Sequence, residues 1–61
     1  MFIELTDVDD GKKFLAQMSH ITIITANEEG GATVEFDDDY ETKVKETYAQ
    51  IVAMLSPGRA A

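Results

Sequence analysis

The sequence predicts a small α+β domain: a β-meander of four to five short antiparallel strands, closed by one C-terminal helix. Three observations carry this prediction. Residues 2–6 and 32–36 alternate apolar and polar side chains, which is typical of strands with one buried face. Residues 21–25 are all β-branched, which favours an extended chain. From Thr47 onward a helix-capping pair precedes apolar residues at helical spacing.

The N-terminal part of the chain predicts a β-hairpin. Residues 2–6 form its first strand, and an acidic turn follows that ends at Gly11. Glycine supplies the positive φ that a tight return needs. Residues 12–16 then form the second strand, with Phe14 facing inward and Lys13 outward.

The middle of the chain predicts a strand that is apolar on both faces. Residues 17–20 before it are either a turn or its first part. Within 21–25, strict alternation points Ile21 and Ile23 to one face and Ile24 to the other. A strand of this kind is typically central in its sheet or covered on both sides.

A second hairpin follows. A glutamate- and glycine-rich turn at 27–31 leads into the strand at 32–36, whose apolar residues face inward. Three aspartates, 37–39, mark the next turn, and residues 40–45 alternate again.

Two registers of this second hairpin stay open. A three-residue loop at 37–39 sets Glu35 opposite Glu41, whereas a loop shifted to 38–40 sets Glu35 opposite Lys43. Both keep the apolar face inward, and the second has the better charge pairing.

The C-terminal helix has a start, an apolar face and an end. Thr47 is a good N-cap, and Gln50 completes a capping box. One stripe is formed by Tyr48, Ile51, Val52 and Leu55. We expect this stripe to pack on the sheet, because so short a helix is marginal alone in water. A Pro-Gly pair ends the helix, so the predicted domain spans 1–56 and a flexible tail spans 57–61.

The charge balance narrows the range of partners that the chain could bind. Twelve acidic residues against five basic ones give a formal net charge of −7. Nucleic acids and anionic membranes attract basic proteins, so both are disfavoured as partners. No apolar stretch reaches the length of a signal peptide or a membrane span, which predicts a cytoplasmic protein. The chain has no cysteine, which removes disulfides and thiolate metal sites.

The residue patterns predict neither an enzyme nor a bound cofactor or metal. His20 lacks a catalytic partner, because a strand sends the adjacent Ser19 to the opposite face. We interpret His20 as a partly buried residue at a strand entry. The aspartates before Gly11 do not fit a calcium loop, whose glycine is sixth and whose glutamate is twelfth. The 37–39 tip is interpreted as a solvated turn, with cation binding as an alternative.

Four apolar residues are candidates for an interaction surface, since a single helix covers only one face of the sheet. They are Phe2, Leu15, Met18 and Ile24. On the uncovered face such residues form an apolar patch that water disfavours. A barrel-like closure would bury the patch internally, whereas self-association or a protein partner would bury it between molecules. Both readings stay open, and we expect a homo-oligomer.

The chain resembles the small FlbD (SwrD-like) proteins. The resemblance lies in IELT at 3–6, the acidic glycine turn, the isoleucine-rich strand from His20, and VKET at 44–47 leading into the helix. It covers 2–55 in order and spacing, and departs at 38–39, where a turn glycine is expected. The resemblance implies a link to flagella and swarming and carries over no catalytic residue.

Together these observations predict a non-enzymatic protein-interaction module that self-associates. One alternative is a cation-binding module at 37–39. The other is a regulatory nucleic-acid-binding protein that would use Lys12, Lys13, Lys43 and Lys45.

Overall fold

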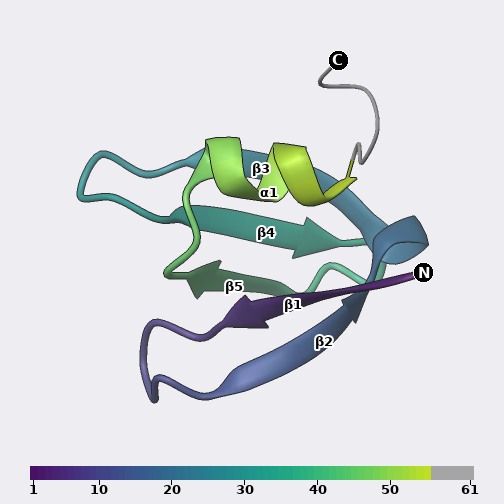
Figure 1. The fold of residues 1–61 in the computed structure, drawn as a ribbon. Coiled ribbons are helices and arrows are strands. Elements are labelled where there is room, and N and C mark those ends of the chain that lie inside the picture. The colour runs from purple at the N-terminus through teal and green to yellow at the C-terminus, as the bar shows by residue number, and fades with distance from the viewer. Residues whose placement is uncertain (56–61) are drawn as a thin grey trace.

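The computed structural model describes residues 1–55 as a small α+β fold of five strands, one 3₁₀ turn and one C-terminal α-helix (Figure 1). The elements are β1 (Phe2–Thr6), β2 (Lys13–Gln17), η1 (Met18–His20), β3 (Ile21–Ala26), β4 (Ala32–Phe36), β5 (Glu41–Val44) and α1 (Tyr48–Leu55). The predicted fold class is confirmed. The expected end of the helix at Pro57 and the tail at 57–61 lie outside the described residues.

The strands form two antiparallel sheets, β1-β2 and β3-β4-β5. The sheets meet at one corner, where Asp7 and Val44 form an isolated antiparallel bridge. Beside this bridge, the Lys45 N–H donates to the Thr6 carbonyl at 2.9 Å. Within residues 1–55 the meander therefore curls at a single corner, and barrel-like closure does not occur.

The core lies between the two sheets and the helix. Its buried residues are Ile3, Leu5, Ala16, Ala32, Val34, Val44 and Ile51. They come from β1, β2, β4, β5 and α1, so almost every element contributes a side chain. Burying each larger one stabilises the fold by about 1.5–3 kcal/mol.

The joint between β2 and β3 is a turn and not a continued strand. Residues Met18–His20 form a single 3₁₀ turn, and the Ile21 N–H donates to the Met18 carbonyl at its end. At this turn the chain leaves the β1-β2 sheet, and it continues as β3 in the three-stranded sheet (Figure 1).

A bulge in β3 overturns the predicted facing of its isoleucines. Ile21 is opposite Phe36 and Ile23 is opposite Glu35, so the register shifts between them. The extra residue flips the alternation. Ile21 and Ile24 both pack against the core, while Ile23 is 51% exposed. The expectation of a central or doubly covered strand is also wrong, because β3 lies at an edge of β3-β4-β5 and the exposed Ile23 shows that one of its faces is uncovered.

The β4-β5 hairpin adopts the register with Glu35 opposite Glu41. Its turn decides this: Asp39 has a φ of 68°, and its N–H donates to the Phe36 carbonyl at 3.1 Å. The Phe36 N–H donates to the Tyr40 carbonyl at 2.8 Å. The register with better charge pairing is not formed, since turn geometry sets register and water screens the exposed Glu41 carboxylate.

The capping box of α1 is confirmed. The Thr47 N–H donates to Gln50 Oε1 at 2.9 Å, and the Gln50 N–H donates to Thr47 Oγ1 at 3.1 Å. Each side chain therefore satisfies a backbone donor that the first helical turn leaves unpaired.

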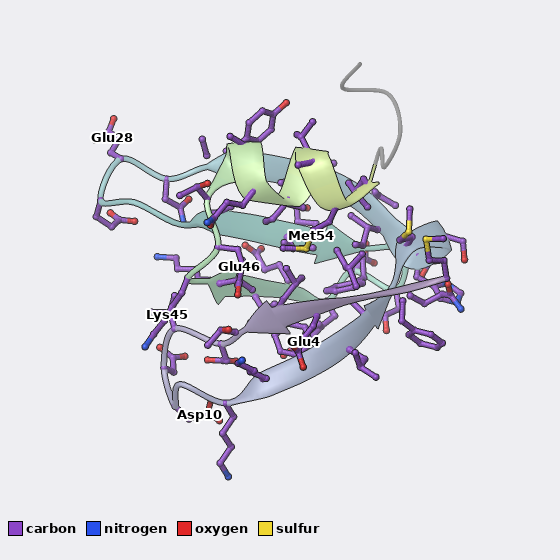
Figure 2. All side chains as sticks on the ribbon, viewed as in Figure 1. Glu4, Asp10, Glu28, Lys45, Glu46 and Met54 are labelled. Atoms are coloured by element: carbon purple, nitrogen blue, oxygen red, sulfur yellow. The ribbon has the colours of Figure 1, made fainter. Side chains whose placement is uncertain are left out.

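The predicted apolar stripe of α1 is confirmed for two of its four residues. Ile51 is buried, and Leu55 packs against the core together with Met54, which Figure 2 shows on the side of α1 that faces the strands. Tyr48 and Val52, however, are 47% and 40% exposed. The helix is rotated so that positions i, i+3 and i+4 counted from Ile51 face inward, which leaves Tyr48 and Val52 on its flank.

Candidate interaction surface

The outer face of the β1-β2 hairpin carries two exposed apolar side chains, Phe2 and Leu15. Phe2 is 58% exposed and Leu15 is 66% exposed. Phe2 is opposite Gln17 and Glu4 is opposite Leu15, so Phe2 and Leu15 are diagonal neighbours across the ladder. Diagonal neighbours on one face are within reach of an aromatic side chain. We call this pair the outer apolar pair.

The structure separates the four candidate surface residues into two groups. Phe2 and Leu15 lie on the outer face of the hairpin. Met18 and Ile24 are partly buried and pack against the core. The bulge in β3 turns Ile24 inward, and the 3₁₀ turn places Met18 against the core. Neither feature has a signal in local periodicity.

A groove runs along β2. One hollow of about 370 Å³ is lined by residues 14–17 of β2 and, apart from β2, by His20, Phe36, Asp37, Asp38 and Tyr40. Successive strand residues point to opposite faces of a sheet. A hollow that contacts four in a row therefore lies along the edge of β2 and not above one face.

The groove continues toward the β1-β2 turn. A second hollow of about 420 Å³ shares Phe14 and Tyr40 with the first and adds Asp10, Lys12 and Thr42, among others. Together the two hollows form what we call the β2 groove. The side opposite β2 is partly aromatic, because Phe36 and Tyr40 pack against each other there with ring centroids 5.9 Å apart.

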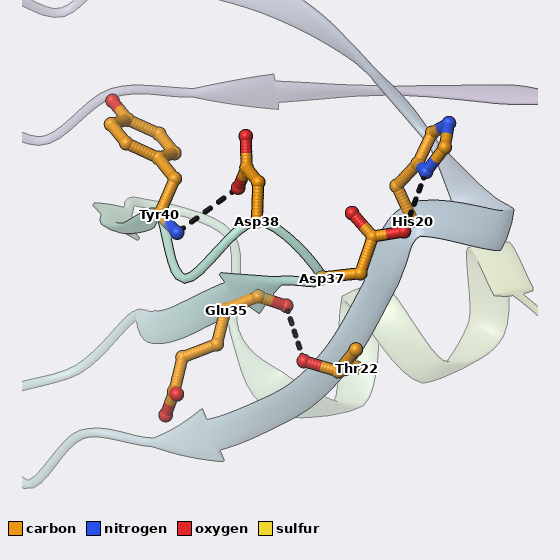
Figure 3. A network of polar contacts seen from close by, with 6 residues as sticks. All are labelled: His20, Thr22, Glu35, Asp37, Asp38 and Tyr40. Carbon is orange, nitrogen blue, oxygen red and sulfur yellow. Dashed lines mark hydrogen bonds and ion pairs between the residues drawn. The ribbon is translucent and has the colours of Figure 1, made fainter.

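The far wall of the β2 groove is held by polar contacts at the β4-β5 turn (Figure 3). His20 Nδ1 lies 2.8 Å from Asp37 Oδ2, and the Asp37 N–H donates to the His20 carbonyl at 2.8 Å. The Tyr40 N–H donates to Asp38 Oδ1 at 3.0 Å. These bonds tie the turn to the end of η1 and fix the position of both carboxylates.

The surroundings of His20 differ from the prediction. His20 is the last residue of η1 and directly precedes β3, so it does lie at a strand entry, but its side chain is 58% exposed and not partly buried. It also has a carboxylate partner in Asp37, which is distant in sequence and comes close through β3-β4 pairing. Residue spacing along the chain carries no signal for this pair.

The hydrogen bonds that bracket the β1-β2 ladder reveal its free edge. At one end the Met18 N–H donates to the Met1 carbonyl, and at the other the Asp7 N–H donates to the Lys12 carbonyl, both at 2.9 Å. In an antiparallel pair, alternate residues direct both backbone groups toward the partner strand. The even-numbered residues of β2 therefore point toward β1.

The odd-numbered residues of β2 point their backbone groups the other way. They are Lys13, Leu15 and Gln17, and each turns an N–H and a C=O away from β1. Within residues 1–55, β1 is the only strand paired with β2, and no other hydrogen bond takes up these groups. The edge of β2 is an unpaired strand edge beside a groove.

The lysines do not form a basic patch that is separate from acidic residues. Lys13 Nζ lies 4.0 Å from Glu4 Oε1. Lys12 lines a hollow with Asp7 and Asp10, and Lys43 lines another with Asp7, Asp9 and Glu41. Lys45 Nζ lies near Gly11, in the acidic β1-β2 turn. Lys12, Lys13 and Lys43 thus each share an ion pair or a hollow with carboxylates.

Two carboxylates of the acidic tip at 37–39 are engaged in contacts within the protein. Asp37 contacts His20, and Asp38 accepts a hydrogen bond from the Tyr40 N–H. In the described part of the chain, no group of three or more His, Cys, Asp or Glu residues is arranged to hold a metal ion.

No protein-family model, curated protein or solved structure matches this chain. Within residues 1–55, no helix combines the length and the apolar character that a membrane crossing requires.

Proposed function

We propose that this chain is a non-enzymatic protein-interaction module that binds through its β1-β2 hairpin. The observation that carries the proposal is the outer apolar pair, Phe2 and Leu15, on a hairpin whose inner face already supplies core residues. Apolar side chains exposed on one face lose contact with water when a partner covers them. Full burial of each is worth about 1.5–3 kcal/mol.

The partner in this proposal is either a different protein or a further copy of this chain. The resemblance of the sequence to FlbD-like proteins adds a flagellar setting to it. The mixed charges around the lysines give no support to the nucleic-acid alternative, since phosphate binding draws on clustered basic residues.

The test compares two double variants, each of which removes two exposed large hydrophobic side chains. Phe2→Ser with Leu15→Ser alters the outer apolar pair, and Tyr48→Ser with Val52→Ser alters the flank of α1. Sedimentation velocity reads self-association, and affinity capture from a lysate, quantified by mass spectrometry, reads other partners. Circular dichroism confirms that both variants keep the fold.

We expect the first double variant to lose self-association or captured partners at least about tenfold, a loss of about 1.4 kcal/mol. The α1 variant should behave as the parent chain does. Equal behaviour of the two variants would refute the proposed surface.

A further inference from the structure

We infer that the free edge of β2 binds an extended, positively charged segment of a partner protein by strand addition. The inference rests on the proposed function and names the chemistry of its partner.

The backbone of β2 offers an incomplete ladder. Lys13, Leu15 and Gln17 each present one N–H and one C=O away from β1, without a hydrogen-bond partner among residues 1–55. An extended segment laid beside these residues takes up donors and acceptors in alternation, as strands of one sheet do. Main-chain pairing of this kind gives affinity without requiring a particular sequence.

The β2 groove provides room where such a segment would lie. Its hollows follow the strand from Gln17 to Lys12, on the side to which the free backbone groups point. Inward side chains of an added strand would contact Phe14, Phe36 and Tyr40. We therefore expect apolar residues at alternate positions of the bound segment.

The charges favour a basic segment over a second copy of the chain. The groove is lined by four carboxylates, Asp7, Asp10, Asp37 and Asp38, against two lysines and His20, which contacts Asp37. The whole chain carries a formal charge of −7, so a second copy arrives with the same sign and is repelled. Lys or Arg residues between the apolar positions would reach the aspartates at both ends of the groove.

The test measures binding of a fluorescein-labelled alternating Lys-Val peptide to the full chain by fluorescence anisotropy at low salt. Two peptides serve as controls: an alternating Glu-Val peptide of equal length, and the Lys-Val peptide N-methylated at alternate residues. N-methylation removes backbone donors and keeps the charge, so it separates strand pairing from attraction between charges.

Two variants of Leu15 test the edge itself. The Leu15 N–H points away from β1, so Leu15→Pro removes one donor at the free edge and leaves the β1-β2 ladder intact. Leu15→Ala is the matched control, because it shortens the side chain and keeps the donor. Leu15→Ala measures the effect of the lost side chain, and we expect Leu15→Pro to weaken Lys-Val binding at least about tenfold more than Leu15→Ala does.

NMR spectra of the chain with the peptide supply an independent readout. The amide protons of Lys13, Leu15 and Gln17 should shift and exchange more slowly with solvent when the Lys-Val peptide is bound. The amide of Ala16, which already faces β1, is the internal reference.

Three results with the peptides would overturn the inference: no binding of the Lys-Val peptide, equal binding of its N-methylated form, or equal binding of the Glu-Val peptide. A fourth would be a dimer of the chain that Leu15→Pro dissociates, because a second copy would then be the occupant of the edge. If Leu15→Pro unfolds the chain, the N-methylated peptide decides alone. Failure here is distinguishable from failure of the proposed function, because the Phe2→Ser and Leu15→Ser test reads side chains of the outer face and this one reads the backbone edge.

Discussion

The Glu46 carboxylate binds Thr6 twice: it accepts the Thr6 backbone N–H at 2.8 Å and the Thr6 hydroxyl at 2.8 Å. Figure 2 shows Glu46 between β1 and the start of α1. The two residues are forty positions apart, so this pair fastens the end of β1 to the segment that leads into the helix. Burial acts to raise the pKa of Glu46, but the two bonds from Thr6, the backbone N–H of Glu46 itself and the charge of Lys13 together lower it below the ordinary value.

This lowered pKa predicts how stability depends on pH. A carboxylate whose pKa is lower in the folded chain stabilises it fully above the ordinary value of 4.5, and the stabilisation is lost as the pH falls through the folded pKa. We expect Glu46→Gln to flatten the stability profile below pH 4.5. Hydrogen bonds to a charged group are worth about 1.5–3 kcal/mol, so the loss at neutral pH should be about 1–2 kcal/mol.

Urea unfolding of the parent chain and of Glu46→Gln at a series of pH values would measure both quantities. Thr6→Val is the matched control: it removes the hydroxyl donor and keeps the N–H, so it should lose part of the pH dependence. An unchanged acid limb in Glu46→Gln would contradict the assignment.

Two adjacent glycines should differ sharply in their tolerance of alanine. Gly30 and Gly31 both have a positive φ, of 97° and 75°, so alanine at either costs about 1 kcal/mol in backbone strain. A Cβ at Gly30 meets open space, whereas one at Gly31 would overlap the carbonyl oxygen of Val44. We therefore expect Gly31→Ala to destabilise by about 3 kcal/mol in total. Thermal melts of the two variants test this, and equal losses would refute the close approach.

The capping box should behave as a coupled pair. Thr47→Ala leaves a helical N–H unpaired and should cost about 1 kcal/mol. Because Gln50 binds back to the Thr47 N–H, the loss in the Thr47→Ala, Gln50→Ala double variant should be smaller than the sum of the single losses. Helix content by circular dichroism and urea midpoints would give the coupling energy. Strictly additive losses would show that the two bonds act independently.

The bulge in β3 predicts opposite outcomes for neighbouring isoleucines. Ile24→Thr places a hydroxyl against the core and should destabilise by about 1–2 kcal/mol. Ile23→Thr makes the same chemical change on the exposed side and should stay within about 0.5 kcal/mol. Denaturant unfolding of both variants decides between the bulged strand and regular alternation, in which Ile23 would be the costlier site.

Features that depend on near neighbours were predictable. Thr47 and Gln50 form their box within one helical turn, and the strand at 2–6 needs only its own alternation to place Phe2 outside. Half of the candidate surface followed from the same reasoning, since Leu15 also alternates within a regular strand.

The rest of the candidate site depends on contacts between distant segments. The far wall of the β2 groove, with Asp37 and Tyr40, reaches β2 only after the chain has turned at η1 and paired β3 with β4. Local charge pairing even favoured the wrong hairpin register. The turn at Asp39 and the screening of Glu41 by water outweigh that pairing in the folded chain.

The sequence by itself determined the class of the fold, the order of its strands and helix, and the strand face on which Phe2 and Leu15 lie. These properties follow from periods of two and 3.6 residues, which act over a few bonds. Tertiary packing alone decided which side of the helix is buried, where β3 bulges and which edge of β2 stays free. Those choices depend on how much apolar surface each arrangement buries against distant segments, and only the folded chain brings these segments together.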